Sequence, residues 1–179
     1  MAKPLKIVIL IAALLLPVAV FVFLHAFGKN QFDIPIYYQT EQELDIEPCY
    51  AIEFPYALDM EKSAYSSLRL DKNKASIFIY LPQHNQNHIH QFVRVNKRVG
   101  KKIQLIVFTE KEIPVESNVL VVSANDAEDF WKCSLLSSNY NDWVLVDEKG
   151  SIRGYYQASE EEINRLIVES DILLKNREQ

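Results

Sequence analysis

The segment ASIFIYLPQHNQNHIHQFVRVNKRVGKKIQLIVFT, residues 75–109, carries the pattern that decides the fold. Ala75–Leu81 and Ile103–Thr109 are short apolar runs rich in β-forming residues, which is typical of buried strands. Between them, Asn87–Val99 spaces apolar residues as one face of a helix. Those residues are Ile89, Phe92, Val93 and Val99. A strand, a helix and a strand in this order predict a right-handed crossover between two parallel strands.

The C-terminal part of the chain predicts antiparallel strands on the same sheet. Trp143–Asp147 and Ser151–Gln157 are joined by a turn in which Gly150 is free to take a positive φ. A short apolar run at Val119–Ser123 and a helix over Asp126–Leu136 come before this hairpin. A final helix follows, because Ser159 and Glu162 have the spacing of a capping box. We therefore predict an α/β fold of the thioredoxin-like type over residues 75–179, preceded by a lead-in segment at residues 29–74.

Residues 1–28 predict a membrane anchor. From Ile7 to Leu24 the chain has no charged residue, and a transmembrane helix needs about 20 apolar residues. Lys3 and Lys6 come before this stretch, which predicts a cytoplasmic N-terminus and a domain on the extracytoplasmic, periplasmic side of the inner membrane. A cleaved signal peptide is the rival interpretation, although its apolar region would be long and no clear cleavage site follows.

The charge and the cysteines restrict the function. After Gly28 the chain has 17 of the 19 basic residues and all 24 acidic residues, a net charge of −7, so we expect no nucleic-acid partner. Cys49 and Cys133 lie 84 positions apart and form no CxxC or metal-ligand spacing. They either pair as a disulfide in an oxidising compartment, or Cys133 is a small buried side chain in an apolar helix. A thiol oxidoreductase acting through this distant pair is the least favoured hypothesis, so we expect no enzymatic activity.

The segment Trp143–Leu174 resembles the C-terminal end of the Sco/SenC family. In that family a strand ending in L-[IV]-D turns into IRGYY and leads to a last helix. The matching positions here are Leu145, Val146, Asp147, Ile152, Arg153, Gly154, Tyr155 and Tyr156. The resemblance implies a membrane-anchored, thioredoxin-like protein associated with copper delivery to cytochrome c oxidase and with thiol exchange. Arg153 is expected to pair with a carboxylate that the sequence does not identify.

The sequence departs from this family at the residues that carry its chemistry. The family has a C-x-x-x-C-P motif after the first core strand and a histidine before the L-[IV]-D strand. This chain has LPQHNQNHIH at the first place, and Asn139 or Asn141 lies nearest the second. The resemblance therefore implies a degenerate site without a resident cofactor. We expect a non-catalytic assembly or interaction factor whose protein partner is linked to respiratory oxidase biogenesis, such as an oxidase subunit.

The histidines at this corner give an alternative function. His84 and His88 are four positions apart, a spacing that on a helix can hold copper or zinc. His90 lies about 200° from His88 around a helix and cannot share an ion with it there. The alternative is thus a copper or zinc delivery protein that uses His84 and His88 in place of the cysteines. The competing interpretation is a solvated helix start in which Asn85 or Asn87 caps the backbone N–H groups.

Overall fold

The computed structural model describes residues 3–27, 33–44, 46–63, 65–82, 85–110, 113 and 118–177. The chain divides into two compact units, Met1–Phe32 and Asp33–Gln179. In the first unit, helix α1 (Lys3–Phe27) contains Pro17. Among the residues whose side chains are described, no helix is both long enough and apolar enough to cross a bilayer. Part of the predicted anchor lies outside those residues, so the membrane anchor at residues 1–28 stays a prediction.

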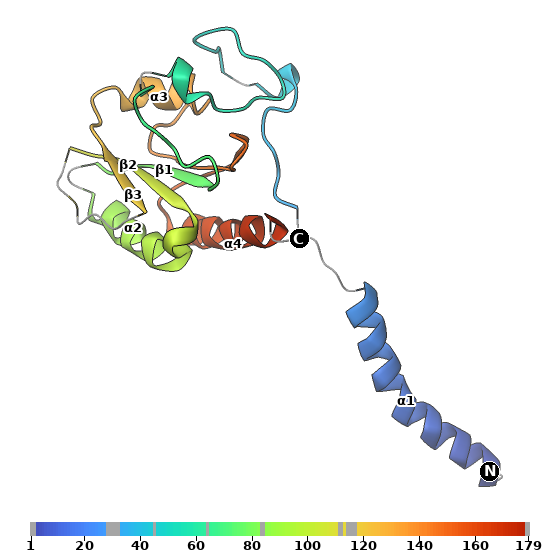
Figure 1. Ribbon diagram of the computed structural model, residues 1–179. Helices are drawn as coiled ribbons and strands as arrows, with labels where there is room; N and C mark the ends of the chain where they lie inside the picture. The colour runs from blue at the N-terminus through green and yellow to red at the C-terminus, as the bar shows by residue number, and fades with distance from the viewer. Residues whose placement is uncertain are drawn as a thin grey trace. The chain divides into compact units, whose positions relative to one another are not determined.

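The second unit is built on a five-stranded mixed sheet in the order β3-β2-β1-β4-β5 (Figure 1). Its strands are β1 (Ser76–Tyr80), β2 (Gln104–Phe108), β3 (Val119–Val122), β4 (Trp143–Val146) and β5 (Ile152–Tyr156). Strands β1, β2 and β3 are parallel, whereas β4 is antiparallel to β1 and β5 is antiparallel to β4. Strand order, directions and the terminal hairpin and helix define a thioredoxin-like α/β fold, as predicted.

The strand register defines two ends of this sheet. Gln104, Ser76, Val146 and Ile152 lie in one row across β2, β1, β4 and β5. We call the end marked by this row the basal end. The other end, at which β1 finishes at Tyr80 beside Phe108, is called the corner end, because the chain turns there from β1 into α2 (Gln86–Val99).

Helices and the lead-in segment form one layer on each face of the sheet. Helices α2 and α4 (Glu160–Arg177) cover one face, and the short α3 (Ala127–Cys133) lies on the other, with the lead-in beside it (Figure 1). Alternation along β1 separates the two cores, because successive side chains of a strand point to opposite faces. Ile77 and Ile79 pack under α2 and α4, whereas Phe78 packs with Phe130 and Trp131 of α3.

The described lead-in residues, 33–44, 46–63 and 65–74, are irregular, as their turn signals and prolines predict. The described part contains the short 3₁₀ helices η1 (Glu41–Glu43) and η2 (Met60–Lys62), and a third, η3 (Gly100–Lys102), follows α2. Tyr38 and Tyr56 of the lead-in are buried in the core on the α3 side. Residues 33–74 therefore belong to the same compact unit as the sheet.

The buried face of α2 differs from the predicted one. Phe92 and Val99 are buried as expected, but Val93 is 42% exposed. His88, Gln91 and Val95 face the interior instead. The prediction was wrong for Val93 because it assumed that the most apolar positions set the orientation of the helix. The observed stripe runs through positions 88, 91, 92, 95 and 99 and includes two polar side chains, His88 and Gln91.

Candidate functional site

The corner between β1 and α2 is the candidate site, because the family that the sequence resembles keeps its cysteines there. The chain leaves β1 with Leu81 N donating to the carbonyl of Phe108 (2.9 Å). Asn85 then caps α2: its Oδ1 accepts from the backbone N–H groups of Asn87 (3.1 Å) and His88 (3.3 Å). Asn87 does not cap; its Nδ2 donates to the carbonyl of Ala158 (2.6 Å). The expected asparagine cap is thus confirmed at Asn85.

His88 points into the protein from the first turn of α2. His88 is only 9% exposed, and its Nδ1 lies 3.5 Å from the carbonyl oxygen of Tyr80. Burial lowers the pKa of His88, and the hydrogen bond to Tyr80 opposes this only in part. The imidazole is therefore neutral at pH 7.

Of the predicted metal pair His84 and His88, the structure describes only His88. His84 lies outside the described residues, so the structure does not test whether the two imidazoles face each other. His90 is exposed on a different side of α2 from His88, as the helical spacing predicts. Within the described part of the chain, no three His, Cys, Asp or Glu side chains come together as a possible metal site.

An aromatic pair and an amide-rich loop lie at the corner end of the sheet. The rings of Tyr80 and Tyr140 meet edge to face, with centroids 5.2 Å apart. Asn139 Nδ2 donates to Asp142 Oδ1 (2.9 Å), and its Oδ1 accepts from the backbone N–H of Asn141 (3.1 Å). Burial raises the pKa of Asp142, although hydrogen bonds from Ser137 and Asn139 partly offset it. The asparagines nearest the family's histidine position are thus engaged in holding this loop.

The two cysteines form a disulfide. Cys49 of the lead-in and Cys133, the last residue of α3, have Cα atoms 5.2 Å apart and are bonded. The bond lies on the α3 side of the sheet, and α2 with the corner histidine lies on the other side. Of the two alternatives for Cys133, the structure therefore shows the disulfide.

Three tyrosine hydroxyls bind the backbone just after α3. Tyr56 donates to the carbonyl of Ser134 (2.6 Å), Tyr155 to that of Leu135 (2.7 Å) and Tyr38 to that of Leu136 (2.9 Å). Burial raises the pKa of Tyr56. The hydroxyls therefore give partners to three successive carbonyls of the segment that follows α3 and hold that segment in place. Sequence reasoning missed Tyr38 and Tyr56, since neither stands in a regular pattern.

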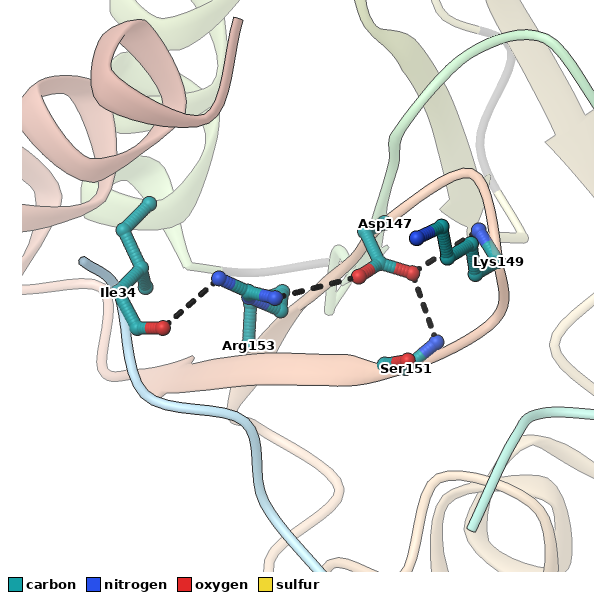
Figure 2. Close-up of polar contacts among 5 residues, drawn as sticks. All are labelled: Ile34, Asp147, Lys149, Ser151 and Arg153. Carbon is teal, nitrogen blue, oxygen red and sulfur yellow. Dashed lines mark hydrogen bonds and ion pairs between the residues drawn. The ribbon is translucent and has the colours of Figure 1, made fainter. Parts of the chain in front are cut away.

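Arg153 joins the lead-in to the β4–β5 hairpin (Figure 2). Its guanidinium lies 3.3 Å from Asp147 Oδ2 and donates to the carbonyl of Ile34 (2.7 Å). Asp147 Oδ1 also accepts from the backbone N–H groups of Lys149 and Ser151, each at 2.9 Å. The side chains of Arg153 and Asp147 are only 11% and 7% exposed. The carboxylate expected for Arg153 is therefore Asp147, and the contact holds the first residues of the domain.

Comparison with known proteins finds similar solved structures but no matching sequence. No family model matches the sequence, and no curated protein sequence matches it. Similar solved structures include BsSco, a member of the Sco family of cytochrome c oxidase assembly proteins, at 12% identity and a TM-score of 0.46, covering 57% of this chain and 81% of that one. A Sco/SenC-family lipoprotein from Bacillus anthracis is 13% identical, with a TM-score of 0.43 and coverage of 57% and 83%. The thioredoxin domain of a thiol-disulfide oxidoreductase from Bacteroides vulgatus is 14% identical, with a TM-score of 0.38 and coverage of 53% and 78%.

The protein is a thioredoxin-like α/β protein, and that statement rests on the strand order and directions of its own sheet.

Proposed function

We propose that this is a membrane-anchored Sco-type protein that acts without thiol chemistry, as an assembly or interaction factor in the biogenesis of a respiratory oxidase. The observation that carries the proposal is the corner after β1. Where the Sco/SenC pattern has two cysteines, Asn85 caps α2 and His88 turns inward to Tyr80. Both cysteines of the chain are bonded to each other on the other side of the sheet.

The position of the disulfide supports a structural role. Thiol exchange needs a stabilised thiolate, which a helix N-terminus provides. Cys133 is instead the last residue of α3, and a helix C-terminus disfavours negative charge. Its bond to Cys49 holds the lead-in on the domain, which suits a clamp better than an exchanging pair.

The proposed location is the inner membrane, with the domain outside the cytoplasm. Lys3 and Lys6 before the apolar stretch support a cytoplasmic N-terminus. The disulfide agrees with this orientation, because disulfides persist in oxidising compartments such as the periplasm. The respiratory partner comes from the family resemblance alone.

Gene deletion followed by complementation tests the proposed function. We expect the deletion strain to lose assembled cytochrome c oxidase, measured as oxidase activity and haem spectrum in isolated membranes. The wild-type gene and the variants Cys49→Ala/Cys133→Ala and His88→Gln should each restore it, provided that immunoblots show similar protein levels. Normal oxidase in the deletion strain would refute the assembly role. Failure of the cysteine variant at wild-type protein level would point to thiol chemistry instead.

The alternative function is copper or zinc delivery through His84 and His88. The lowered pKa of His88 favours it, because neutral imidazole is the form that binds metal. Titration of the purified full-length protein with Cu(II), Cu(I) and Zn(II) distinguishes the two functions. Binding at micromolar affinity or tighter that is lost in His84→Ala and retained in His90→Ala would favour the delivery protein over the assembly factor.

A further inference from the structure

Positive charge is concentrated at the basal end of the sheet. Four cations fall within six positions where α2 ends and η3 begins, and all four side chains are exposed. They are Lys97, Arg98, Lys101 and Lys102. This segment leads directly into Gln104, the first residue of β2 and a member of the basal row. A domain with a net charge of −7 thus has a strongly basic patch at one end.

The turn before β1 extends this patch. Asp71 N donates to Gln104 Oε1 (3.0 Å), and Gln104 N donates to the carbonyl of Ala75 (2.9 Å). These bonds hold the turn that carries Lys72 and Lys74 beside the basic segment. We call this set of residues, Lys72, Lys74, Lys97, Arg98, Lys101 and Lys102, the basal patch.

A cavity of about 780 Å³ continues the patch toward the β4–β5 turn. Its cationic wall residues are Arg69, Lys72, Lys74 and Lys149. Acidic residues line it as well: Asp59, Glu61, Asp71, Asp147 and Glu148. Three of them are in ion pairs, Asp59 with Lys62 (3.8 Å), Asp71 with Lys74 (3.5 Å) and Asp147 with Arg153 (3.3 Å). The wall of the cavity is therefore of mixed charge, and the positive excess of this end comes from the four exposed cations where α2 ends and η3 begins.

The chain also enters the domain at the basal end. Tyr37 N donates to the carbonyl of Ile152, and the carbonyl of Ile34 accepts from Arg153. Ile152 is the β5 member of the basal row. Three strand spacings separate it from Gln104, which amounts to about 14 Å at 4.8 Å per spacing.

This entry point restricts where an anchored domain can be. Asp33 is six residues beyond Phe27, the end of α1, and six extended residues reach at most about 20 Å. With the N-terminal segment in a membrane, the end of the domain that carries the tether is the end kept near the lipid surface. That end is the one that carries the basal patch.

We propose that the basal patch binds anionic phospholipid headgroups of the membrane in which the protein is anchored. The inference rests on the membrane anchoring stated under the proposed function. Lysine and arginine side chains near an anionic bilayer are attracted to it within a Debye length, about 8 Å at physiological ionic strength. The contact fixes the orientation of the domain, so that the corner end faces away from the bilayer and is presented to a partner.

Energy transfer in reconstituted vesicles tests the docking. The full-length protein is placed in phosphatidylcholine vesicles with and without phosphatidylglycerol, and transfer from Trp131 and Trp143 to a dansyl-labelled lipid is measured. We expect more transfer with phosphatidylglycerol, and a loss of this gain near 1 M salt, where the Debye length is about 3 Å. The variant Lys97→Gln/Arg98→Gln/Lys101→Gln/Lys102→Gln should lower the equilibrium constant for docking about 10²–10³-fold.

A matched variant separates the patch from net charge. Gln42→Glu/Asn125→Asp/Lys132→Glu lowers the net charge by the same four units at exposed positions of the lead-in and around α3. It should dock like the wild type. An equal loss in this variant, or transfer that does not depend on phosphatidylglycerol or salt, would overturn the docking; the basal patch would then be left to an acidic protein partner.

Flotation with pure phosphatidylcholine vesicles separates the two levels of the proposal. If all variants float but the energy transfer does not depend on the lipid charge, the protein is anchored and the docking proposal is wrong. If the wild type does not float, the anchoring itself is wrong and the inference falls with it. If the fourfold variant fails to fold, the wild type still decides the test, because high salt should abolish the additional energy transfer that phosphatidylglycerol causes.

Discussion

Removing the Cys49–Cys133 disulfide tests how firmly the lead-in is held on α3. The bond closes a loop of 84 residues. In the chain-entropy model, closing a loop of this length lowers the entropy of the unfolded state and so raises the free energy of unfolding by about 4–5 kcal/mol. Measured disulfides commonly contribute about 2–4 kcal/mol. We take about 3 kcal/mol as the expected loss of the free energy of unfolding. For a domain of roughly 150 residues this corresponds to a fall in Tm of about 6–12 °C.

The assay is thermal unfolding followed by circular dichroism, with and without reductant. The Tm of the wild type should fall by about 6–12 °C when the disulfide is reduced. The variant Cys49→Ala/Cys133→Ala should melt at the Tm of the reduced wild type, with or without reductant. Native far-UV and near-UV spectra should persist at 20 °C, because the hydroxyls of Tyr38, Tyr56 and Tyr155 still hold the segment that follows α3. A wild-type Tm that reductant does not change, while free-thiol titration shows complete reduction, would refute the reasoning.

Three further changes test the other contacts. Asn85→Ala removes the cap of α2 and should cost about 1 kcal/mol in urea unfolding, whereas Asn85→Asp, which keeps the acceptor, should cost little; equal losses would contradict the cap. Arg153→Met leaves the buried carboxylate of Asp147 without its partner and should cost about 3–5 kcal/mol, and adding Asp147→Asn should recover part of it; no recovery would argue against the pairing. Burial lowers the pKa of His88 in the folded state, so between the unfolded value near 6.5 and the lower folded value the unfolded chain binds more protons. Stability should therefore fall as the pH drops below about 6.5, and His88→Gln should make this part of the curve flatter; superimposable curves would contradict the burial of a neutral imidazole.

The strands and the order of elements were predictable because each rests on a local pattern. The runs at Ala75–Leu81 and Ile103–Thr109 are mostly apolar on both faces, which suits strands covered on both sides, and β1 and β2 are observed within them. The hairpin follows from Gly150, whose φ of 86° is the positive value that its turn requires. Ser159 Oγ accepts from the backbone N–H of Glu162 at 3.3 Å, as the capping box predicts.

Contacts between distant residues were not predictable from such patterns. Arg153 and Ile34 are 119 positions apart, and Tyr56 and Ser134 are 78 apart. No periodicity in a single sequence encodes these pairings, because they depend on how the lead-in crosses the face of the sheet. The disulfide stayed undecided for the same reason, since spacing in sequence does not give the distance between two Cα atoms. At the candidate site, the sequence predicted that one of two asparagines, Asn85 or Asn87, caps α2. It could not predict that His88 points inward, because that orientation depends on the carbonyl of Tyr80 in the preceding strand.

The length of α3 explains why the lead-in is part of the domain. With seven residues it is about 10 Å long, whereas five strands at 4.8 Å spacing present a face about 19 Å wide. A helix this short leaves much of its side of the sheet to be covered by other residues. The lead-in supplies them: Tyr38 and Tyr56 are buried there, with Phe54 and Leu68 packed around the same core. The disulfide, the tyrosine hydroxyls and Arg153 hold this cover at three places. A chain that began at residue 75 would lose Tyr38, Tyr56, Phe54 and Leu68 from this core, so the smallest unit expected to fold begins near Asp33.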